Sequence, residues 1–108
     1  PPPRRPRASP QPPVVPERSD VLGELTMLAR ARRALLNDPM LALLLSDEHA
    51  RSFPRGTFEE EREVLAIESL LKLQRLDEAR SRARAFELRF PRSAQRAHLA
   101  KLIANPGE

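Results

Sequence analysis

Apolar residues recur along this chain at the spacing of one helix face, in five stretches joined by short polar connections. The first stretch predicts a helix that begins at Ser19 or Asp20, since either residue can cap it. Its expected packing face consists of Val21, Leu22, Leu25, Leu28, Ala29, Leu35 and Leu36.

The second helix is expected to follow at once and to end near Ser52. Asp38 predicts its cap, and Pro39 suits the first helical position, where its missing N–H is no loss. The opening of this helix, Met40 to Leu45, is apolar on all sides, which predicts burial on two sides.

The third helix has a clear start, because Thr57 and Glu60 have the spacing of a capping box. Its packing face consists of Phe58, Val64, Leu65, Ile67, Leu70, Leu71 and Leu73. After a turn near Gln74, a fourth helix places Ala79, Ala83, Phe86 and Phe90 on one stripe. Ser93 is expected to cap a fifth helix with the apolar positions Ala97, Leu99, Leu102 and Ile103.

Two parts of the chain are similar at an offset of 37 residues. Phe53-Pro54-Arg55-Gly56 falls on Phe90-Pro91-Arg92-Ser93, Ala42 falls on Ala79, and Ala29 falls on Ala66. In each copy a small residue precedes the proline by 12 positions, Ala42 before Pro54 and Ala79 before Pro91. A period in this range indicates stacked helical hairpins, in which the alanine allows close approach and the proline ends the second helix.

This pattern resembles the tetratricopeptide repeat (TPR), whose second helix carries a small residue and a proline at this spacing. The ending Arg89 to Ser93 is similar to repeats of bacterial cell-envelope scaffold proteins. The period is longer than the usual repeat of about 34 residues, and the first-helix signature of the family is absent, so the chain is described as TPR-like. The resemblance spans Asp20 to Ala104 and implies protein binding in the cell envelope or periplasm, without catalysis.

The predicted fold class is therefore all-α, with two TPR-like antiparallel hairpins and a C-terminal capping helix. We expect a linker over residues 1–18 and one domain over residues 19–108. Within the domain, the first repeat covers about 20–56, the second about 57–92 and the capping helix about 93–104.

The N-terminal segment is rich in proline, because eight of the 12 prolines lie within the first 16 residues. Such a segment lacks the backbone donors and the apolar residues for a packed element, so we expect a stiff, disordered arm. An alternative is a Pro-rich ligand for an aromatic groove, with Arg4, Arg5 and Arg7 supplying charge. The linker is favoured.

The arm carries most of the net charge of +4. Its four arginines and one glutamate contribute +3, which leaves +1 for residues 19–108. The chain also has no Trp and no Tyr to stack on bases, so nucleic acid is an unfavoured partner. The absence of cysteine excludes disulfides and Cys-based zinc sites.

No stretch reaches the roughly 18 consecutive apolar residues of a membrane span. We expect contact with a membrane only through an anchor upstream of Pro1. Asp47-Glu48-His49 are adjacent on one helix and do not face one another, and His98 stands apart. The sequence therefore predicts no cofactor, no metal site and no catalytic residue. His49 is expected to be a partly buried packing residue, because it aligns with Phe86.

Two charged segments remain. Glu59, Glu60, Glu61 and Glu63 are interpreted as a solvated first turn that complements the helix dipole, with an acidic docking edge as the alternative. On the fourth helix, Arg80 and Arg84 project together, and Arg82 is expected to pair with Glu78.

The favoured function is a non-enzymatic interaction module, a scaffold or adaptor that binds a protein segment or partner helix. The candidate contacts are Met40, Leu43, Leu44, Arg80 and Arg84. The apolar opening of the second helix also predicts homo-oligomerisation through the first hairpin. The alternative function is an Arg-mediated binder of nucleic acid or an anionic surface, using the arm with Arg80, Arg84 and Arg89.

Overall fold

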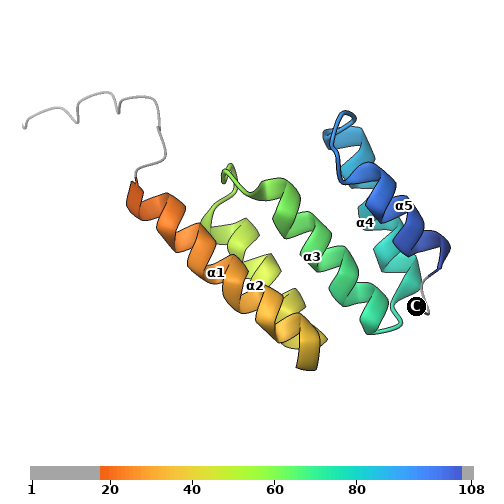
Figure 1. Ribbon diagram of the computed structural model, residues 1–108, viewed down its shortest axis with the longest axis horizontal. Helices are drawn as coiled ribbons and strands as arrows, with labels where there is room; N and C mark the ends of the chain where they lie inside the picture. Colours follow the sequence, from red (N-terminus) through yellow and green to blue (C-terminus); the bar gives the residue numbers. More distant parts are fainter. Residues whose placement is uncertain (1–17, 106–108) are drawn as a thin grey trace, which may run out of the picture.

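The structure, a computed structural model, describes residues 18–105, which contain five helices and no strand. They are α1 (Arg18–Asn37), α2 (Pro39–Ser52), α3 (Glu59–Lys72), α4 (Leu76–Arg89) and α5 (Arg96–Ala104) (Figure 1). The predicted all-α class is confirmed. The predicted linker, apart from Arg18, lies outside the described residues.

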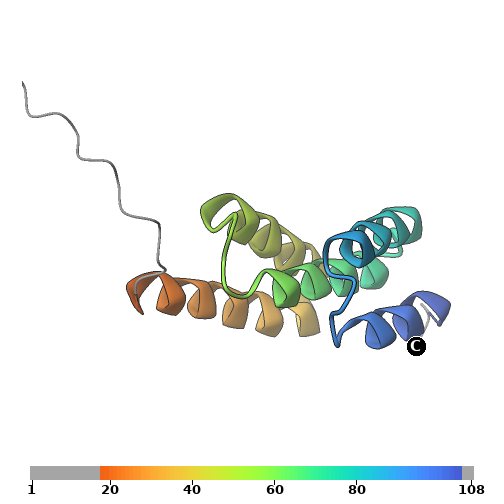
Figure 2. The same cartoon turned by 90° about the horizontal axis from the view of Figure 1, so that it is seen from above.

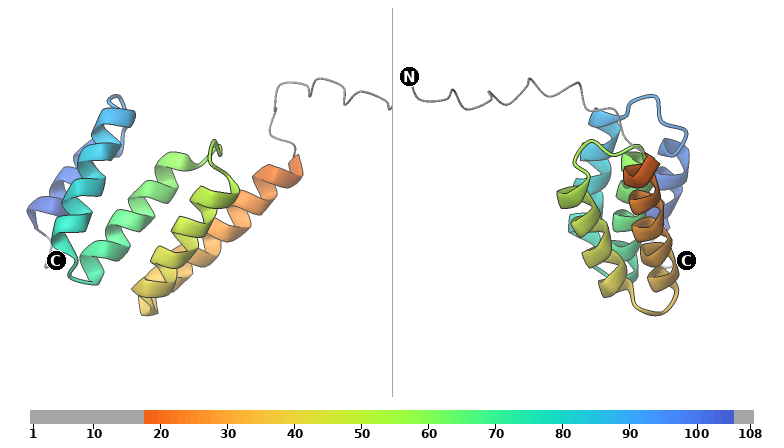
Figure 3. Two further views of the ribbon diagram at one scale, coloured as in Figure 1. Left: turned by 180° about the vertical axis from the view of Figure 1, so that it is seen from behind. Right: turned by 90° about the vertical axis from the view of Figure 1, so that its left-hand side faces the viewer.

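The helices form two antiparallel hairpins, α1 with α2 and α3 with α4, and α2 also packs against α3. α5 closes the array by packing against α3 and α4. The chain is thereby arranged in two layers, with α1, α3 and α5 in one and α2 and α4 in the other (Figures 2 and 3). The predicted arrangement of two hairpins and a last helix is confirmed.

α3 is central because it contributes to both hydrophobic clusters of the core. One cluster joins α1, α2 and α3 and consists of Leu28, Ala31, Leu35, Ala42, Leu45 and Leu65. The other joins α2 to α5 and consists of Leu43, Val64, Ala66, Ile67, Leu70, Leu71, Ala79, Phe86 and Leu99. Two faces of α3 are therefore buried, which stabilises the array by excluding apolar surface from water.

The sequence repeat is visible in the structure as two copies of a helix–turn–helix. α2 and α4 have equal lengths at an offset of 37 residues, and α3 and α5 begin at the same offset. Ala42 and Ala79 are both fully buried, which allows the close helix approach expected at those positions. The C-caps agree as well, with φ −133° and ψ 65° at Phe53 and φ −126° and ψ 64° at Phe90. Pro54 and Pro91 directly follow these caps and are exposed.

The predicted packing face of α1 is wrong in part. Leu22, Leu25 and Leu36 are exposed, and so is Ala29. Leu28 and Leu35 are buried as predicted, and Glu24 and Ala31 are buried although they were not part of the predicted face. α1 stands at the end of the array and has neighbours only on the side of α2 and α3, so a narrower stripe than expected is covered. Ala29 and Ala66 are thus equivalent in the repeat but differ in burial, because Ala66 is fully buried between its neighbours and Ala29 is exposed at the end of the array.

The predicted caps had mixed outcomes. The Asp38 carboxylate accepts a hydrogen bond from the Leu41 N–H at 3.1 Å, which confirms this cap. The Thr57 and Glu60 capping box is wrong, because α3 begins at Glu59 with no side-chain cap bond from its own N-cap residue. Ser93 does not cap α5 directly, because it accepts from the Gln95 N–H in the turn before that helix.

The opening of α2 is buried on two sides, as predicted, because α2 packs against α1 and against α3 and contributes to both core clusters. Ala42, Leu43 and Leu45 are buried, whereas Met40, Leu41 and Leu44 are 44 %, 41 % and 56 % exposed. These three exposed residues lie on the remaining side of α2, which no helix covers because α5 packs against α3 and α4.

Candidate functional site

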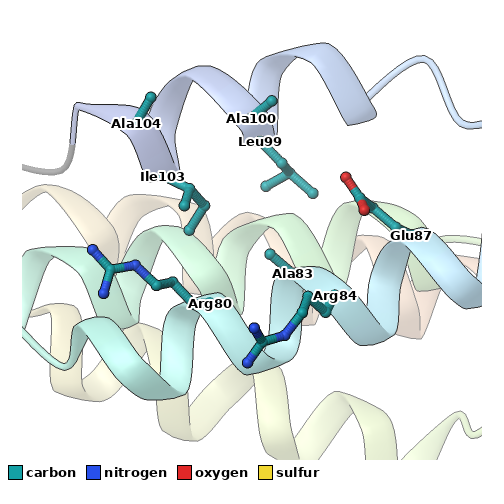
Figure 4. A pocket seen from close by; sticks show the side chains of 8 residues that line it. All are labelled: Arg80, Ala83, Arg84, Glu87, Leu99, Ala100, Ile103 and Ala104. Atoms are coloured by element: carbon teal, nitrogen blue, oxygen red, sulfur yellow. The ribbon is translucent and has the colours of Figure 1, made fainter.

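A groove between α4 and α5 is the candidate functional site of this chain. It encloses about 380 Å³, and its apolar lining comes from Ala83 on α4 and from Leu99, Ala100, Ile103 and Ala104 on α5. In Figure 4, Leu99 and Ile103 descend from α5 towards Ala83. Small side chains dominate this surface, so the backbone of a bound segment can approach closely.

Three charged side chains of α4 border the groove: Arg80, Arg84 and Glu87 (Figure 4). Arg80 lies 3.8 Å from the Asp77 carboxylate in an exposed pair, which contributes little to stability because solvent screens it. Within residues 18–105, Arg84 forms no ion pair. The arginines are thus available to orient an acidic ligand along the apolar floor.

The structure brings only part of the predicted partner surface together. Arg80 and Arg84 line the groove, as their predicted common projection requires. Met40 and Leu44 lie on the exposed face of α2, away from this groove. The prediction that Leu43 contacts a partner is wrong. Leu43 is 6 % exposed and packs in the central core, where no partner can contact it. The groove residues of α5 were missed, since their apolar spacing indicated only a cap.

Arg82 has a structural role that differs from the predicted pairing with Glu78. Its guanidinium donates to Glu63 of α3 at 2.9 Å and to Asp47 of α2 at 3.1 Å. Burial alone would raise the pKa of Glu63, but the hydrogen bonds and charges of Arg82 and Arg62 outweigh it and hold that pKa below its ordinary value. Glu78 pairs with Arg75 instead, at 2.7 Å.

The acidic turn of α3 is therefore more than a solvated face. Glu59 accepts from Arg89 of α4 at 2.6 Å, and Glu63 accepts from Arg82. These bonds attach the start of α3 to α4. They also pair Arg89, one of the arginines predicted to form an anionic-surface site, with Glu59, whereas Arg80 and Arg84 of that set make no bond to α3 in the described residues.

A buried polar cluster at the opposite end of the array was not predicted. Glu24 of α1 is 1 % exposed and lies 3.1 Å from His49 Nε2, and it accepts from the backbone N–H groups of Thr57 and Phe58 at 3.0 and 3.3 Å. Its carboxylate therefore holds the turn that leads into α3. The signal in the sequence was the placement of Glu24 within the apolar stripe of its helix.

Burial lowers the pKa of His49 below its ordinary value, and the nearby Arg62 charge lowers it further, against the opposing effect of Glu24. His49 is fully buried and lies against Phe53, with ring centroids 5.2 Å apart. The Phe86 and Phe90 rings of the second copy are 5.1 Å apart. His49 thus packs as its alignment with Phe86 predicted, although it is more deeply buried than expected.

The equivalent place in the second copy is a hollow of about 530 Å³, lined by Glu60, Glu61, Phe90, Pro91, Arg92, Ser93, Ala94 and Gln95. Glu61 holds the position of Glu24, but Phe86 replaces His49 and offers it no hydrogen bond. No ion pair of Glu61 occurs among the described residues. This hollow is therefore an incomplete copy of the Glu24 cluster.

His98, on α5, lies 3.9 Å from Glu68 in a partly exposed pair. In the described part of the chain, no three His, Asp or Glu side chains gather as metal ligands would. None of the helices within residues 18–105 combines the length and the apolar character of a membrane span. No family model, curated protein or solved structure compared with the chain gives a significant match.

Proposed function

We propose that this chain is a TPR-like, non-enzymatic interaction module that holds a segment of a partner protein in the groove between α4 and α5. The observation that carries the proposal is the open apolar lining of this groove next to two exposed arginines. An apolar surface with a few well-placed charges is typical of peptide recognition, because burial supplies affinity and charge supplies orientation.

The proposal includes a role as scaffold or adaptor in the cell envelope, where the Pro-rich arm tethers the domain. The support for this location is the resemblance of Arg89 to Ser93, and of the two Ala and Pro pairs, to repeats of envelope scaffold proteins. The packed two-layer array supports the adaptor role, since its helices already present a formed surface to a partner.

Photo-crosslinking in the cells from which the chain comes tests the proposal. A benzophenone amino acid in place of Ala100, which lines the groove, is expected to give a discrete protein adduct after irradiation. The matched control replaces Ala85, an exposed residue of α4 outside the groove lining. Equal adducts from both positions, or none from Ala100, would contradict the proposal.

A further inference from the structure

The groove between α4 and α5 has a filled counterpart in the same molecule. Residues 39–67 and 76–104 are copies at an offset of 37, so the surface between α2 and α3 corresponds to the surface between α4 and α5. The positions equivalent to Arg80, Arg84 and Ile103 are Leu43, Asp47 and Ala66. In the first copy these positions are covered by a helix, α4, because Leu43 and Ala66 share a core cluster with Ala79 and Phe86.

The way in which α4 covers its groove is specific. Ala79 is fully buried, Phe86 is 2 % exposed seven residues later, and Arg82 between them bonds Asp47 on one wall and Glu63 on the other. Arg82 thus pairs with one acidic residue on each of the two helices that α4 covers. α4 therefore combines an apolar stripe with one charged side chain that bridges both neighbouring helices.

The second groove is bordered by Arg80, Arg84 and Glu87 and is net positive, whereas the first presents Asp47 and Glu63 to Arg82. Arg84 stands where the first groove has Asp47, and Ala100 stands where it has Glu63. Both α5 alanines of the lining are exposed, and Ile103 is only partly buried. α5 also makes a less extensive contact with α4 than α3 makes with α2.

We infer that the occupant is an amphipathic helix of a partner protein that lies parallel to α4 and presents acidic side chains to Arg80 and Arg84. This inference rests on the proposed function and specifies its ligand. The helix would place a small residue at the position of Ala79, a bulky apolar residue seven positions later, and a Glu or Asp three positions after the small residue. Carboxylates in its first turn would face Arg80, where its own dipole also favours them.

The α4 sequence itself supplies the probe for a direct test. A peptide of LDEARSRARAFELR with its seventh residue, the counterpart of Arg82, changed to Glu is expected to bind the purified chain. Held helical by a staple on its outward face, it should bind about tenfold more tightly than the same peptide with Arg, because a partly buried ion pair replaces a repulsive one. Fluorescence anisotropy at moderate salt measures both affinities.

The Arg84→Glu variant should reverse this preference, so that the Arg peptide binds more tightly. Arg84 is exposed, and circular dichroism confirms that the variant is folded. Arg55→Glu, an exposed change of equal charge in the turn before α3, is the matched control and should leave the preference unchanged.

Three results would overturn the inference. If neither peptide binds while Ala100 still gives its adduct in cells, the groove holds a segment other than this helix and the proposed function stands. Equal binding of both peptides would show that the charge of the seventh peptide residue does not determine affinity. A dimeric chain that Arg84→Glu converts to a monomer would replace the partner helix with a second copy.

Discussion

At the scale of single residues, Glu24 joins three segments that are distant in sequence. Its carboxylate contacts α2 through His49 and the start of α3 through two backbone N–H groups. Gly56 fits beside it because a Cβ there would overlap with the carboxylate. A buried carboxylate that accepts several hydrogen bonds is stabilising, whereas the same donors without it would be left unsatisfied.

Glu24→Ala is expected to lower the free energy of unfolding by about 2 to 4 kcal/mol, since it leaves His49 and the N–H groups of Thr57 and Phe58 without their buried partner. Urea denaturation followed by circular dichroism measures the change. Glu61→Ala is the matched control at the equivalent position and should alter stability by no more than about 0.5 kcal/mol. Equal effects of the two changes would show that Glu24 stabilises the fold no more than Glu61 does at the equivalent position.

His49 should make stability depend on pH. Its pKa is lowered in the fold from 6.5, so the unfolded chain binds the proton more readily. Its contribution is complete above pH 6.5 and is lost as the pH falls towards the folded pKa. Glu24 of α1 and Glu59 and Arg62 of α3 are the charged groups that act on it.

His49→Phe should remain folded, because Phe86 occupies the equivalent position of the second copy. The variant is expected to lose the decline in stability just below pH 6.5. The decline from Glu63, whose pKa is lowered from 4.5, begins only below that value and should persist. Urea titrations at a series of pH values test this, and parallel curves for wild type and variant would refute it.

At the scale of elements, α4 is attached to its neighbours by packing and by Arg82. The side chain of Arg82 is 24 % exposed, and that of Glu63 is 17 % exposed. Burial would lower the pKa of Arg82, but its bonds to Glu63 and then to Asp47 outweigh this and raise it. The ion pair is therefore formed at all pH values at which Glu63 is charged.

Arg82→Ala should destabilise the domain by roughly 1 to 3 kcal/mol, because Glu63 and Asp47 lose their shared donor in a partly dry site. Arg84→Ala, two residues away on the groove side, should change stability by no more than about 0.5 kcal/mol. Thermal or urea unfolding of both variants gives the comparison. A cost for Arg84→Ala as large as that for Arg82→Ala would contradict the assignment of their roles.

At the scale of the whole molecule, the array exposes apolar surface on α2. Leu43 and Leu44 are adjacent, yet Leu43 is 6 % exposed and Leu44 is 56 % exposed. Leu43→Glu should unfold the domain, with a loss of more than about 4 kcal/mol, because an unpaired charge would enter the core. Leu44→Glu should retain full helicity. Circular dichroism of the two variants checks this placement.

Homo-oligomerisation through the first hairpin remains a prediction for the exposed face of α2. Leu43 no longer belongs to the predicted contact surface, because it is buried. Met40, Leu41 and Leu44 form its apolar residues. We expect wild type to self-associate at high concentration and Leu44→Glu to weaken that association, since a charge would lie between two copies. Sedimentation velocity measures this, and a monomeric wild type at high concentration would end the prediction.

Local chemistry in the sequence was sufficient for the helices and their repeat. Helical spacing, Asp38 with Pro39, and the recurrence of an alanine 12 residues before a proline depend on contacts within a few turns, so they can be read without the fold. The common projection of Arg80 and Arg84 follows from the same spacing. The burial of His49 was predicted from its alignment with Phe86, which assigns both residues the same neighbours.

Only the tertiary structure decided which side of each helix is covered. Apolar spacing does not reveal that α1 lies at the end of the array, so Leu22 and Leu36 were expected inside while Glu24 was overlooked. Pairings between helices, such as Arg82 with Glu63 and Glu24 with Thr57, depend on distances between residues far apart in the sequence. The groove between α4 and α5 also depends on tertiary packing, because Ala83 and Ile103 share a surface only when α4 and α5 are packed on α3.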